Sequence, residues 1–334
     1  MVAVEGGGIR AHRTATVSVI IPVKDVTMYA REAIGEVRKY FPECEILLIP
    51  DHDDGTKVEG ARIIASWPIA APGEKRDLAV SLAEGEIVAF LDDDAFPAAG
   101  WLSAALPHFD DDNVAAVGGP AVTPVSNSPR QRASGWVLAT FMGSARSTYR
   151  YRPGKRRDVD DLPSVNLFVR RSDFDAVGGF ECGYWPGEDT ELCRKLGSDL
   201  KKRIVYEPEA LVFHHRRPVF RAHLRQQARY GLHRGHFARR FQGNSRRISY
   251  AIPALFTTGL LLGPIVAGSI PLGYQAYATA LSIYAVGLLA TGVWVWYHDR
   301  DLYVVMLTIT GILATHIAYG LSYIRGALTK ELIH

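Results

Sequence analysis

The chain is poor in cysteine and has nothing at its start that looks like an export signal. Its three cysteines, Cys44, Cys182 and Cys193, are an odd number and lack the spacing of a metal site. A reducing compartment is the simplest interpretation, because extracellular proteins tend to pair their cysteines. Residues 1–15 are polar, rich in glycine and without an apolar core. We therefore expect a disordered N-terminus, followed by a part of the chain that stays in the cytoplasm.

Acidic residues are absent between Ala210 and His298, although the net charge of the chain is only +3. Ten arginines occur in the first part of this stretch, within residues 216–247, which we predict to be a basic interfacial helical segment. They are Arg216, Arg217, Arg221, Arg225, Arg229, Arg234, Arg239, Arg240, Arg246 and Arg247. Because this segment leads straight into an apolar region, we expect membrane lipids as its partner and no nucleic acid.

Three apolar segments without charged residues follow, at residues 248–270, 274–297 and 302–324. Each is long enough to cross a hydrocarbon core about 30 Å thick. A buried helical hairpin is the alternative, but a chain of this size could hardly enclose three such segments. We therefore predict three transmembrane helices over residues 248–325 and a C-terminal tail over residues 326–334.

The arginines also predict an orientation, because the side of a membrane with more Lys and Arg in short flanking segments is usually cytoplasmic. They predict a multi-pass protein of the cytoplasmic membrane whose N-terminal half faces the cytoplasm. With three crossings the C-terminus would lie on the other side, although Arg325 and Lys330 favour the reverse.

The N-terminal half alternates strand-like with helix-like segments. Runs of β-branched and apolar residues occupy residues 17–22, 45–50, 62–64 and 86–91, and helical patterns occupy residues 30–40 and 75–83. This alternation predicts an α/β fold over residues 16–215, with a mostly parallel, Rossmann-like sheet.

Three consecutive carboxylates, Asp92, Asp93 and Asp94, follow the last of these strands. Open α/β sheets bind ligands just outside the carboxyl ends of their strands, and adjacent like charges are best tolerated beside a cation. Oxygen ligands suit Mg²⁺ or Mn²⁺. On spacing alone, a solvated acidic turn is the alternative.

Motifs along this half resemble those of the family 2 glycosyltransferases, whose nucleotide-sugar-binding domain has the GT-A fold. The matching residues are 21–25, 75–77, 90–94, 118–120, Asn166, 170–171, 178–180 and 187–189. The resemblance covers about residues 16–247, and it rests on the order and spacing of these motifs together.

The resemblance implies a metal-dependent, inverting hexosyl or other glycosyl transferase that uses a UDP- or GDP-sugar. Asp92 and Asp94 match the family's D-x-D pair, in which one carboxylate contacts the ribose and the other binds a metal on the diphosphate. We assign Asp92 and Asp93 to the donor and Asp94 to Mg²⁺ or Mn²⁺. His214 would be a further metal ligand, and we prefer it to His215.

Further donor contacts follow from the same resemblance. Pro22, Val23 and Asp25 match positions that hold the nucleobase. Asp51 would be a second base contact, but the sequence departs from the usual pattern here, which leaves Asp53 and Asp54 open as well. Lys75 and Arg76 would contact the diphosphate, unless they are surface charges of a helix.

Asp189 matches the catalytic base of the family, and Glu188 precedes it. An inverting transfer needs one carboxylate to take the proton of the acceptor hydroxyl group as that oxygen attacks. The alternative is that both carboxylates only stabilise the start of a helix. Trp185 and Gly187 would contact the acceptor.

Gln226, Arg229 and Tyr230 resemble the Gln-x-x-Arg-Trp motif of membrane-bound polysaccharide synthases, with Tyr in place of Trp. The resemblance implies that Arg229 pairs with the donor diphosphate and that Tyr230 stacks on the acceptor sugar. Arg221, Arg225 and Arg229, spaced four apart, could instead hold anionic lipid head groups.

Together these features predict a membrane-anchored glycosyltransferase that moves a sugar from a nucleoside-diphosphate donor to a lipid-linked or glycan acceptor at the cytoplasmic membrane face. Cell-envelope glycan biosynthesis is the expected setting. The alternatives are a processive polysaccharide synthase, a polyprenyl-phosphate glycosyltransferase and, from a different class, a metal-dependent nucleotidyltransferase. A membrane scaffold would not need Asp92, Asp94 and Asp189 together.

Overall fold

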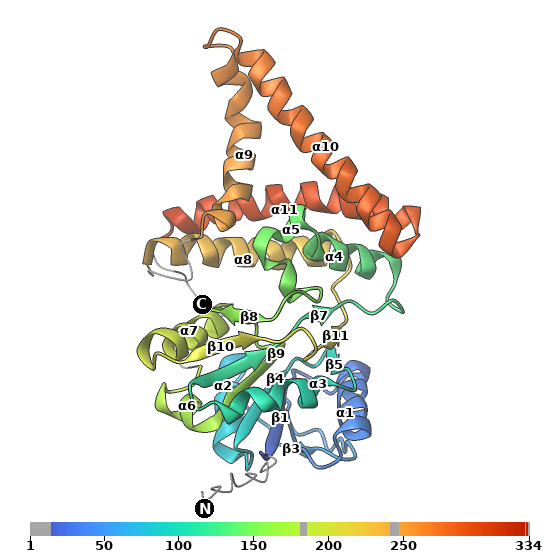
Figure 1. The fold of residues 1–334 in the computed structure, drawn as a ribbon, viewed down its shortest axis with the longest axis vertical. Helices are drawn as coiled ribbons and strands as arrows, with labels where there is room; N and C mark the ends of the chain where they lie inside the picture. Colours follow the sequence, from blue (N-terminus) through green and yellow to red (C-terminus); the bar gives the residue numbers. More distant parts are fainter. Residues whose placement is uncertain (1–14, 181–185, 241–246, 331, 333–334) are drawn as a thin grey trace, which may run out of the picture.

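The computed structural model describes residues 15–180, 186–240, 247–330 and 332. The segment expected to be disordered falls outside these residues except for Ala15, and so does Trp185, which the sequence assigns to the acceptor. Figure 1 shows an α/β unit formed by the N-terminal part of the chain and a helical region formed by the C-terminal part.

An eight-stranded sheet forms the centre of the α/β unit, in the order β3-β2-β1-β4-β9-β6-β10-β8. Its strands are β1 (Val17–Pro22), β2 (Glu45–Ile49), β3 (Arg62–Ile63), β4 (Ile87–Leu91), β6 (Val114–Gly118), β8 (Arg157–Val159), β9 (Asn166–Arg170) and β10 (Arg203–Tyr206). The predicted parallel arrangement is confirmed for β3-β2-β1-β4, but β9 runs antiparallel between β4 and β6. The chain enters β9 from β8 and a loop, without the crossover helix that a parallel neighbour usually has.

Both faces of the sheet are buried, which explains why its central strands are apolar without alternation. Val19 and Ile21 of β1 belong to the cluster that contains residues of α1 (Met28–Tyr40) and α3 (Trp101–Ala105). Ile20 belongs to the opposite cluster, which contains residues of α2 (Pro72–Leu82), α6 (Arg171–Ala176) and α7 (Glu188–Arg194). The strand residues therefore face the two layers of helices in turn.

One edge of the sheet collects the ends of several strands. β1 and β4 run side by side, with Ile20 opposite Phe90, so that Pro22 and Asp92 lie at the same edge. A small second sheet is built there from β5 (Ala95–Pro97), β7 (Ala121–Val122) and β11 (Val212–His214). Its register pairs Ala95 with His214, which brings the histidine beside the aspartate triplet.

Asn166 joins three segments at this edge. Its side-chain oxygen accepts a 2.8 Å hydrogen bond from the indole nitrogen of Trp101, and its amide nitrogen donates at 2.7 Å to the carbonyl of Ala210. All three side chains are buried. The sequence analysis included this residue in a motif but did not anticipate that it would connect β9, α3 and the approach to β11.

The remaining helices that precede the C-terminal region in the chain are mostly short. They are η1 (Leu106–Asp110), α4 (Pro129–Ala139), α5 (Phe141–Ser144), η2 (Ala145–Arg150), η3 (Lys195–Asp199) and the longer α8 (Arg221–Arg240). This last helix, α8, lies within the predicted basic helical segment and begins shortly after β11, a strand of the small second sheet.

Three helices, α9 (Ile248–Ala267), α10 (Gly273–Asp299) and α11 (Leu302–Leu328), are long and apolar enough to cross a membrane. Their bounds agree closely with the segments predicted from the sequence. Figure 1 shows α9 and α10 as a hairpin that projects away from the sheet, whereas α11 lies alongside α8.

The turn between α10 and α11 is fastened to α4 by buried polar contacts. The guanidinium of Arg132 donates to Asp299 at 3.1 Å and to Asp301 at 2.7 Å. The indole nitrogen of Trp136 donates to Asp299 at 2.7 Å. The Asp299 side chain is only 6% exposed, so these donors supply its hydrogen bonds in place of water.

We predict that Asn166→Leu destabilises the protein by about 1–3 kcal/mol, because Trp101 would keep a buried N–H without an acceptor. Denaturant or thermal unfolding of the detergent-solubilised protein would measure the loss. Asn113→Ala, at an exposed turn, is the matched control and should change stability by less than about 0.5 kcal/mol. Equal stability of the Asn166 variant and the wild type would contradict this account.

Candidate active site

A cleft of about 680 Å³ lies between α8, the apolar helices and the edge of the sheet where Pro22 and Asp92 lie. We call this edge the catalytic edge. Its volume is in the range usual for small-molecule sites. Many residues that the sequence singles out line it: Pro22, Arg76, Asp92, Asp93, Asp94, Gly187, Glu188, Asp189, His214, Gln226, Arg229 and Tyr230. These residues come from distant parts of the chain, so the fold brings together what the motifs only suggested.

Val23, Asp51 and Lys75 form a separate group outside this cleft. The ammonium of Lys75, whose residue is 2% exposed, donates to Asp51 and, at 2.5 Å, to the carbonyl of Val23. Asp53 and Asp54 instead accept hydrogen bonds from backbone N–H groups of their own turn. Of the three aspartates considered as contacts of the nucleobase, Asp51 is the one linked through Lys75 to the loop after β1.

Asp25 follows Val23 in that loop and is exposed. It does not line the cleft, and neither do Val23, Asp51 and Lys75.

Arg76 is buried between two loops of the catalytic edge and is only 3% exposed. It donates to Asp92 at 2.8 Å and to Glu188 at 3.3 Å. The alternative that Lys75 and Arg76 are surface charges of a helix is therefore wrong. One guanidinium links the aspartate triplet to the Glu188–Asp189 pair, two motifs that are almost a hundred residues apart in sequence.

Within the aspartate triplet, Asp93 is the residue whose negative charge its surroundings disfavour. Burial and the two neighbouring aspartates raise the pKa of Asp93 to about 7. Burial would also raise the pKa of Asp94, but His214, Arg216 and Arg217 outweigh it and lower that pKa. An added cation would relieve this repulsion.

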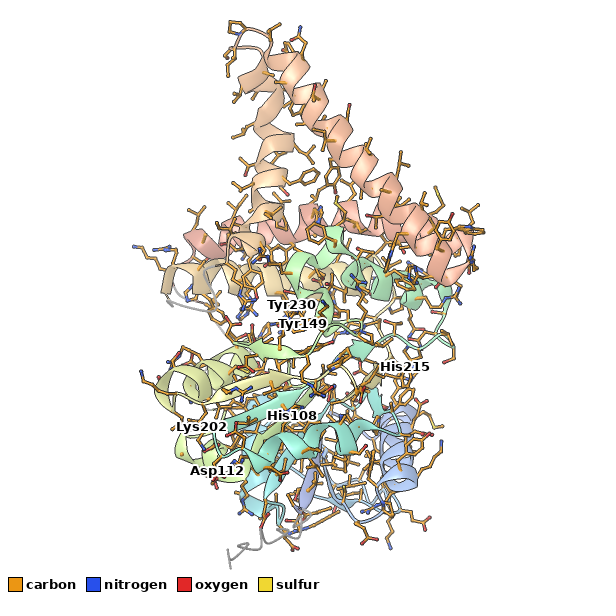
Figure 2. The ribbon with its side chains drawn as sticks, in the orientation of Figure 1. His108, Asp112, Tyr149, Lys202, His215 and Tyr230 are labelled. Carbon is orange, nitrogen blue, oxygen red and sulfur yellow. The ribbon has the colours of Figure 1, made fainter. Side chains whose placement is uncertain are left out.

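His214 is the histidine placed at the triplet, as we preferred from the sequence. Its Nε2 lies 2.9 Å from Asp94 Oδ1. His215 also lines the cleft, but its ring nitrogens contact other residues, with Nε2 2.8 Å from Glu32 and Nδ1 2.6 Å from Asn127. Figure 2 labels His215 near β11, toward the α1 side of the unit.

Asp94 and His214 could supply a divalent cation with one oxygen and one nitrogen ligand. Within the described residues no group of three or more His, Cys, Asp or Glu side chains could hold a metal by itself. Mg²⁺ and Mn²⁺ often bind through one or two protein ligands and substrate phosphates, so the donor set fits such an ion when a diphosphate is present.

Asp189 lies at the start of α7 in a buried, charged environment. Burial and Asp161 raise its pKa, and Arg234 and Arg150 act against this rise. Burial and Asp189 raise the pKa of the neighbouring Glu188 to about 7. A carboxyl group with a raised pKa is suited to take up a proton.

Sequence reasoning missed the cluster that surrounds Asp189. Asp161, only 1% exposed, accepts hydrogen bonds from Arg150 and Arg234 at 3.0 and 2.9 Å. Arg234 also donates to the hydroxyl of Thr190 at 3.2 Å. The paired acids Asp160 and Asp161 before Pro163 were a visible signal, but the sequence alone gave no reason to pair them with arginines so far away.

The cluster also fixes α8 over the cleft. Arg234 belongs to α8, as do Gln226 and Tyr230, whose side chains are joined by a 3.2 Å hydrogen bond from the amide to the phenol oxygen. Figure 2 shows Tyr230 between the helical region and the sheet. The motif that resembles Gln-x-x-Arg-Trp therefore faces the same cleft as the carboxylates.

The other end of the cleft reaches the apolar helices. Phe256 of α9, Tyr284 of α10 and His316 of α11 line it there, together with Met142 of α5. The rings of Phe256 and Tyr284 stack with centroids 4.3 Å apart. The Nε2 of His316 lies 2.9 Å from the Met142 carbonyl, and its Nδ1 lies 2.9 Å from the Tyr284 hydroxyl. The cleft thus has a charged end and an aromatic, apolar end.

Comparison with known proteins agrees with this arrangement. The profile of glycosyl transferase family group 2 matches residues 87–319, which is more than half of the chain. The chain belongs to this family. The matched region contains the aspartate triplet, Asp189, α8 and most of the apolar helices.

Two curated relatives are the pre-mycofactocin glycosyltransferases of Mycobacterium tuberculosis strains CDC 1551 / Oshkosh and ATCC 25618 / H37Rv. Each is 32% identical to this chain over 161 residues, which are 48% of the chain and 33% of the relative. The chain therefore spans about a third of the length of these relatives.

Among solved structures, the chain is similar to the mannosyltransferase PcManGT from Pyrobaculum calidifontis in complex with GDP-Man and Mn²⁺. The TM-score is 0.54 at 17% identity, and the match covers 93% of this chain and 88% of that chain. At this identity the likeness concerns the fold, and it confirms the predicted GT-A-like core.

We predict that Arg76→Gln destabilises the protein by about 3 kcal/mol at neutral pH, because the buried Glu188 and the half-buried Asp92 lose their cation. Arg76 also lowers the pKa of Glu188, so the variant raises that pKa further above its unfolded value. A carboxyl group with a raised pKa costs stability only above its unfolded pKa. The loss should therefore be larger at pH 8 than at pH 5.

Thermal unfolding of the two proteins across this pH range measures the difference. Arg194→Gln is the control, because Arg194 makes partly exposed ion pairs with Glu191 and Asp199. A loss for Arg76→Gln that does not depend on pH would contradict the electrostatic account.

Proposed function

We propose that this family 2 glycosyltransferase is membrane-anchored and inverting, and that it moves a sugar from a nucleoside-diphosphate donor to a lipid-linked or glycan acceptor at the cytoplasmic membrane face. The observation that carries the proposal is the single cleft that joins a carboxylate-rich end to an apolar end between membrane-type helices.

The donor would lie at the carboxylate-rich end. The nucleobase of a UDP- or GDP-sugar would be held at the end of β1 and in the loops after β1 and β2, by Pro22, Val23, Asp25 and Asp51. Asp92 and Asp93 would contact the sugar-nucleotide itself. Lys75 would act by fixing Asp51, and Arg76 by holding Asp92 in place.

Asp94 and His214 would hold Mg²⁺ or Mn²⁺ together with the donor diphosphate. When bound, such an ion offsets the charge that develops on a departing nucleoside diphosphate. Arg229 and Tyr230 of α8 line the same cleft, where Arg229 would add a guanidinium contact to the diphosphate and Tyr230 would cover the sugar.

Asp189 would be the base. It would take the proton of the acceptor hydroxyl group while that oxygen attacks the anomeric carbon from the side opposite the leaving diphosphate. Arg234, Arg150 and Thr190 hold the surrounding loop, and Glu188 is fixed by Arg76. Gly187, with a backbone φ of 128°, allows the sharp turn that presents Asp189 to the cleft.

The apolar end of the cleft supports an acceptor that carries a lipid. Phe256, Tyr284 and Met142 line the end that adjoins the membrane-type helices, where an acyl or isoprenoid chain would enter from the bilayer. The arginines of residues 216–247 favour the cytoplasmic side for the catalytic domain. Since the relatives from Mycobacterium tuberculosis are pre-mycofactocin glycosyltransferases, that acceptor belongs in the test panel.

An acceptor that is itself a lipid phosphate is a second candidate, favoured by Arg150, Arg229 and Arg234 at the cleft. Such an acceptor already carries a negative oxygen and offers no hydroxyl proton to Asp189. The two candidates therefore differ in their dependence on this carboxylate. Incubation with UDP- and GDP-sugars and lipid extract, followed by mass spectrometry of the products, would identify donor, acceptor and number of sugars added.

For a hydroxyl acceptor, we predict that Asp189→Asn lowers kcat about 10²- to 10⁴-fold while donor binding changes little, because the variant removes the base and keeps the side-chain shape. Transfer assays and calorimetric titration with the nucleotide measure the two quantities. Glu191→Gln, on the solvent side of the same helix, is the matched control. Wild-type turnover in Asp189→Asn would remove Asp189 as base and favour the lipid-phosphate acceptor.

We also predict that removal of divalent cations with a chelator stops transfer and that Mn²⁺ or Mg²⁺ restores it. His214→Gln should raise the metal concentration needed for half-maximal activity, because one ligand is lost. His215→Gln is the control, since its ring contacts Glu32 and Asn127. Full activity in chelator would exclude the proposed role of the cation.

A further inference from the structure

The last apolar helix, α11, touches the rest of the catalytic half along its whole length. Its 27 residues extend over about 40 Å. Near its start, Val304 belongs to the same buried cluster as Val137 of α4. In the middle, Thr315 lies 2.9 Å from His223 of α8. Near its end, the carbonyl of Ala327 accepts a 2.8 Å hydrogen bond from Arg239. A helix that crossed a bilayer would leave these partners after a few turns.

Glycines allow α8 and α11 to pack with their backbones close together. Gly231 and Gly235 are one turn apart on α8, and a Cβ atom on Gly231 would stand 2.5 Å from the carbonyl oxygen of Tyr319. Gly235 meets the carbonyl of Tyr323 in the same way. Residue numbers rise together on both helices, so the two run in the same direction, as Figure 1 shows.

This pairing is hard to reconcile with a membrane-crossing α11, because of the charge on its partner. α8 contains Arg221, Arg225, Arg229, Arg234 and Arg239. Charged side chains are costly at the centre of a bilayer. If α11 crossed the hydrocarbon core, the arginine-rich helix packed along it would have to enter the core as well.

The outward face of α11 has the composition of a lipid-contacting surface. Tyr303, Met306, Leu313, Leu321 and Leu328 form a stripe at helical spacing and are between 37% and 76% exposed. The opposite face contains Val304, Thr308, Gly311, Ile312 and Thr315, which are buried. No Asp, Glu, Lys or Arg interrupts the helix from Leu302 to Ile324.

The stripe is continuous with the hairpin of α9 and α10. Gly320 packs against the carbonyl of Pro253 at the start of α9, and His316 is joined to Tyr284 of α10. The hairpin therefore rises from the same layer in which α11 lies, and the lipids that surround the hairpin would also meet the stripe.

We propose that α11 lies in the plane of the membrane, with this stripe inserted among the lipids of the leaflet nearest the catalytic domain. Among the described helices, α9 and α10 then make the two crossings, and the C-terminus lies on the same side as the catalytic domain. An exposed apolar stripe on a helix that packs along the arginine-rich α8 fits a position at the interface, and the occupant of the stripe is the lipid leaflet. The proposal replaces the expectation of three crossings and does not depend on which sugar is transferred.

Depth measurements on the full chain in proteoliposomes test the proposal. Spin labels at Tyr303→Cys, Leu313→Cys, Leu321→Cys and Leu328→Cys, with the three native cysteines changed to alanine, report depth through oxygen and nickel collision rates. An in-plane helix gives similar depths at all four positions. A crossing helix gives shallow depths at Tyr303 and Leu328 and the greatest depth near Leu313, with a change of about 1.5 Å per residue, and this result would overturn the proposal.

Ile283→Cys and Val293→Cys on the exposed side of α10 are the matched controls. They should show a depth gradient in the same sample. A flat profile on α10 as well as α11 would mean that the hairpin does not insert, which also contradicts the proposal.

A protease test keeps the native cysteines and so does not rely on the substituted background. An epitope tag after His334 and a second tag at Ser269, in the turn between α9 and α10, are followed in sealed vesicles whose orientation is set by cleavage of the catalytic domain. The C-terminal tag should be cut together with the catalytic domain and the Ser269 tag protected. Protection of the C-terminal tag when the catalytic domain is cut would restore the third crossing.

Discussion

Charge compensation by buried arginines is the constraint on which the catalytic edge depends. Asp92, Asp93, Asp94, Asp161, Glu188 and Asp189 gather where strands and loops of the sheet end, and most are partly or fully removed from water. Without cations nearby they would repel one another and favour an open loop structure. Arg76 joins the first group to Glu188, and Arg150 and Arg234 enclose Asp161. Within the triplet, burial and the neighbouring carboxylates still disfavour the charged form of Asp93, and a metal cation bound there would offset this repulsion.

The same arginines connect the two halves of the molecule. Arg234 comes from the helix that packs on α11, and its contact with Asp161 therefore couples the position of the membrane-associated layer to the loop that carries Asp189. Asp189, the proposed base, and α11, the proposed membrane-associated helix, are thus linked through Arg234. A family 2 glycosyltransferase with a lipid-linked acceptor would require such a fixed relation.

Much of this could be predicted from the sequence, and the reasons are local. The apolar runs of β1, β2 and β4 and the charge-free segments of α9, α10 and α11 are long and strongly patterned, so their type and approximate bounds follow from composition. The position of Asp92 after a buried strand likewise follows from local pattern. The contacts of Arg76 with Glu188 and of Asp161 with Arg234 could not be predicted, because they join segments 112 and 73 residues apart.

The antiparallel direction of β9, which the sequence did not predict, and the in-plane position that we propose for α11 have a common physical origin. The sequence pattern of β9 is that of any buried strand, and only its entry from β8 and a loop makes it antiparallel. The pattern of α11 is that of a crossing helix, and only its packing against the arginines of α8 argues for another position. In both cases an apolar sequence shows that the element lies in apolar surroundings. It does not show the direction of the element, or whether those surroundings are protein or lipid.

The anchor of Asp299 to Arg132 and Trp136 has a consequence for which part of an acceptor can react. Because the corner between α10 and α11 is fastened to α4, the catalytic domain cannot rise from or tilt against the membrane layer without breaking buried hydrogen bonds. With α11 in the membrane plane, the carboxylates would stand at one set height above the lipids. The enzyme would then select a lipid-linked acceptor by the distance between its membrane anchor and its reactive group.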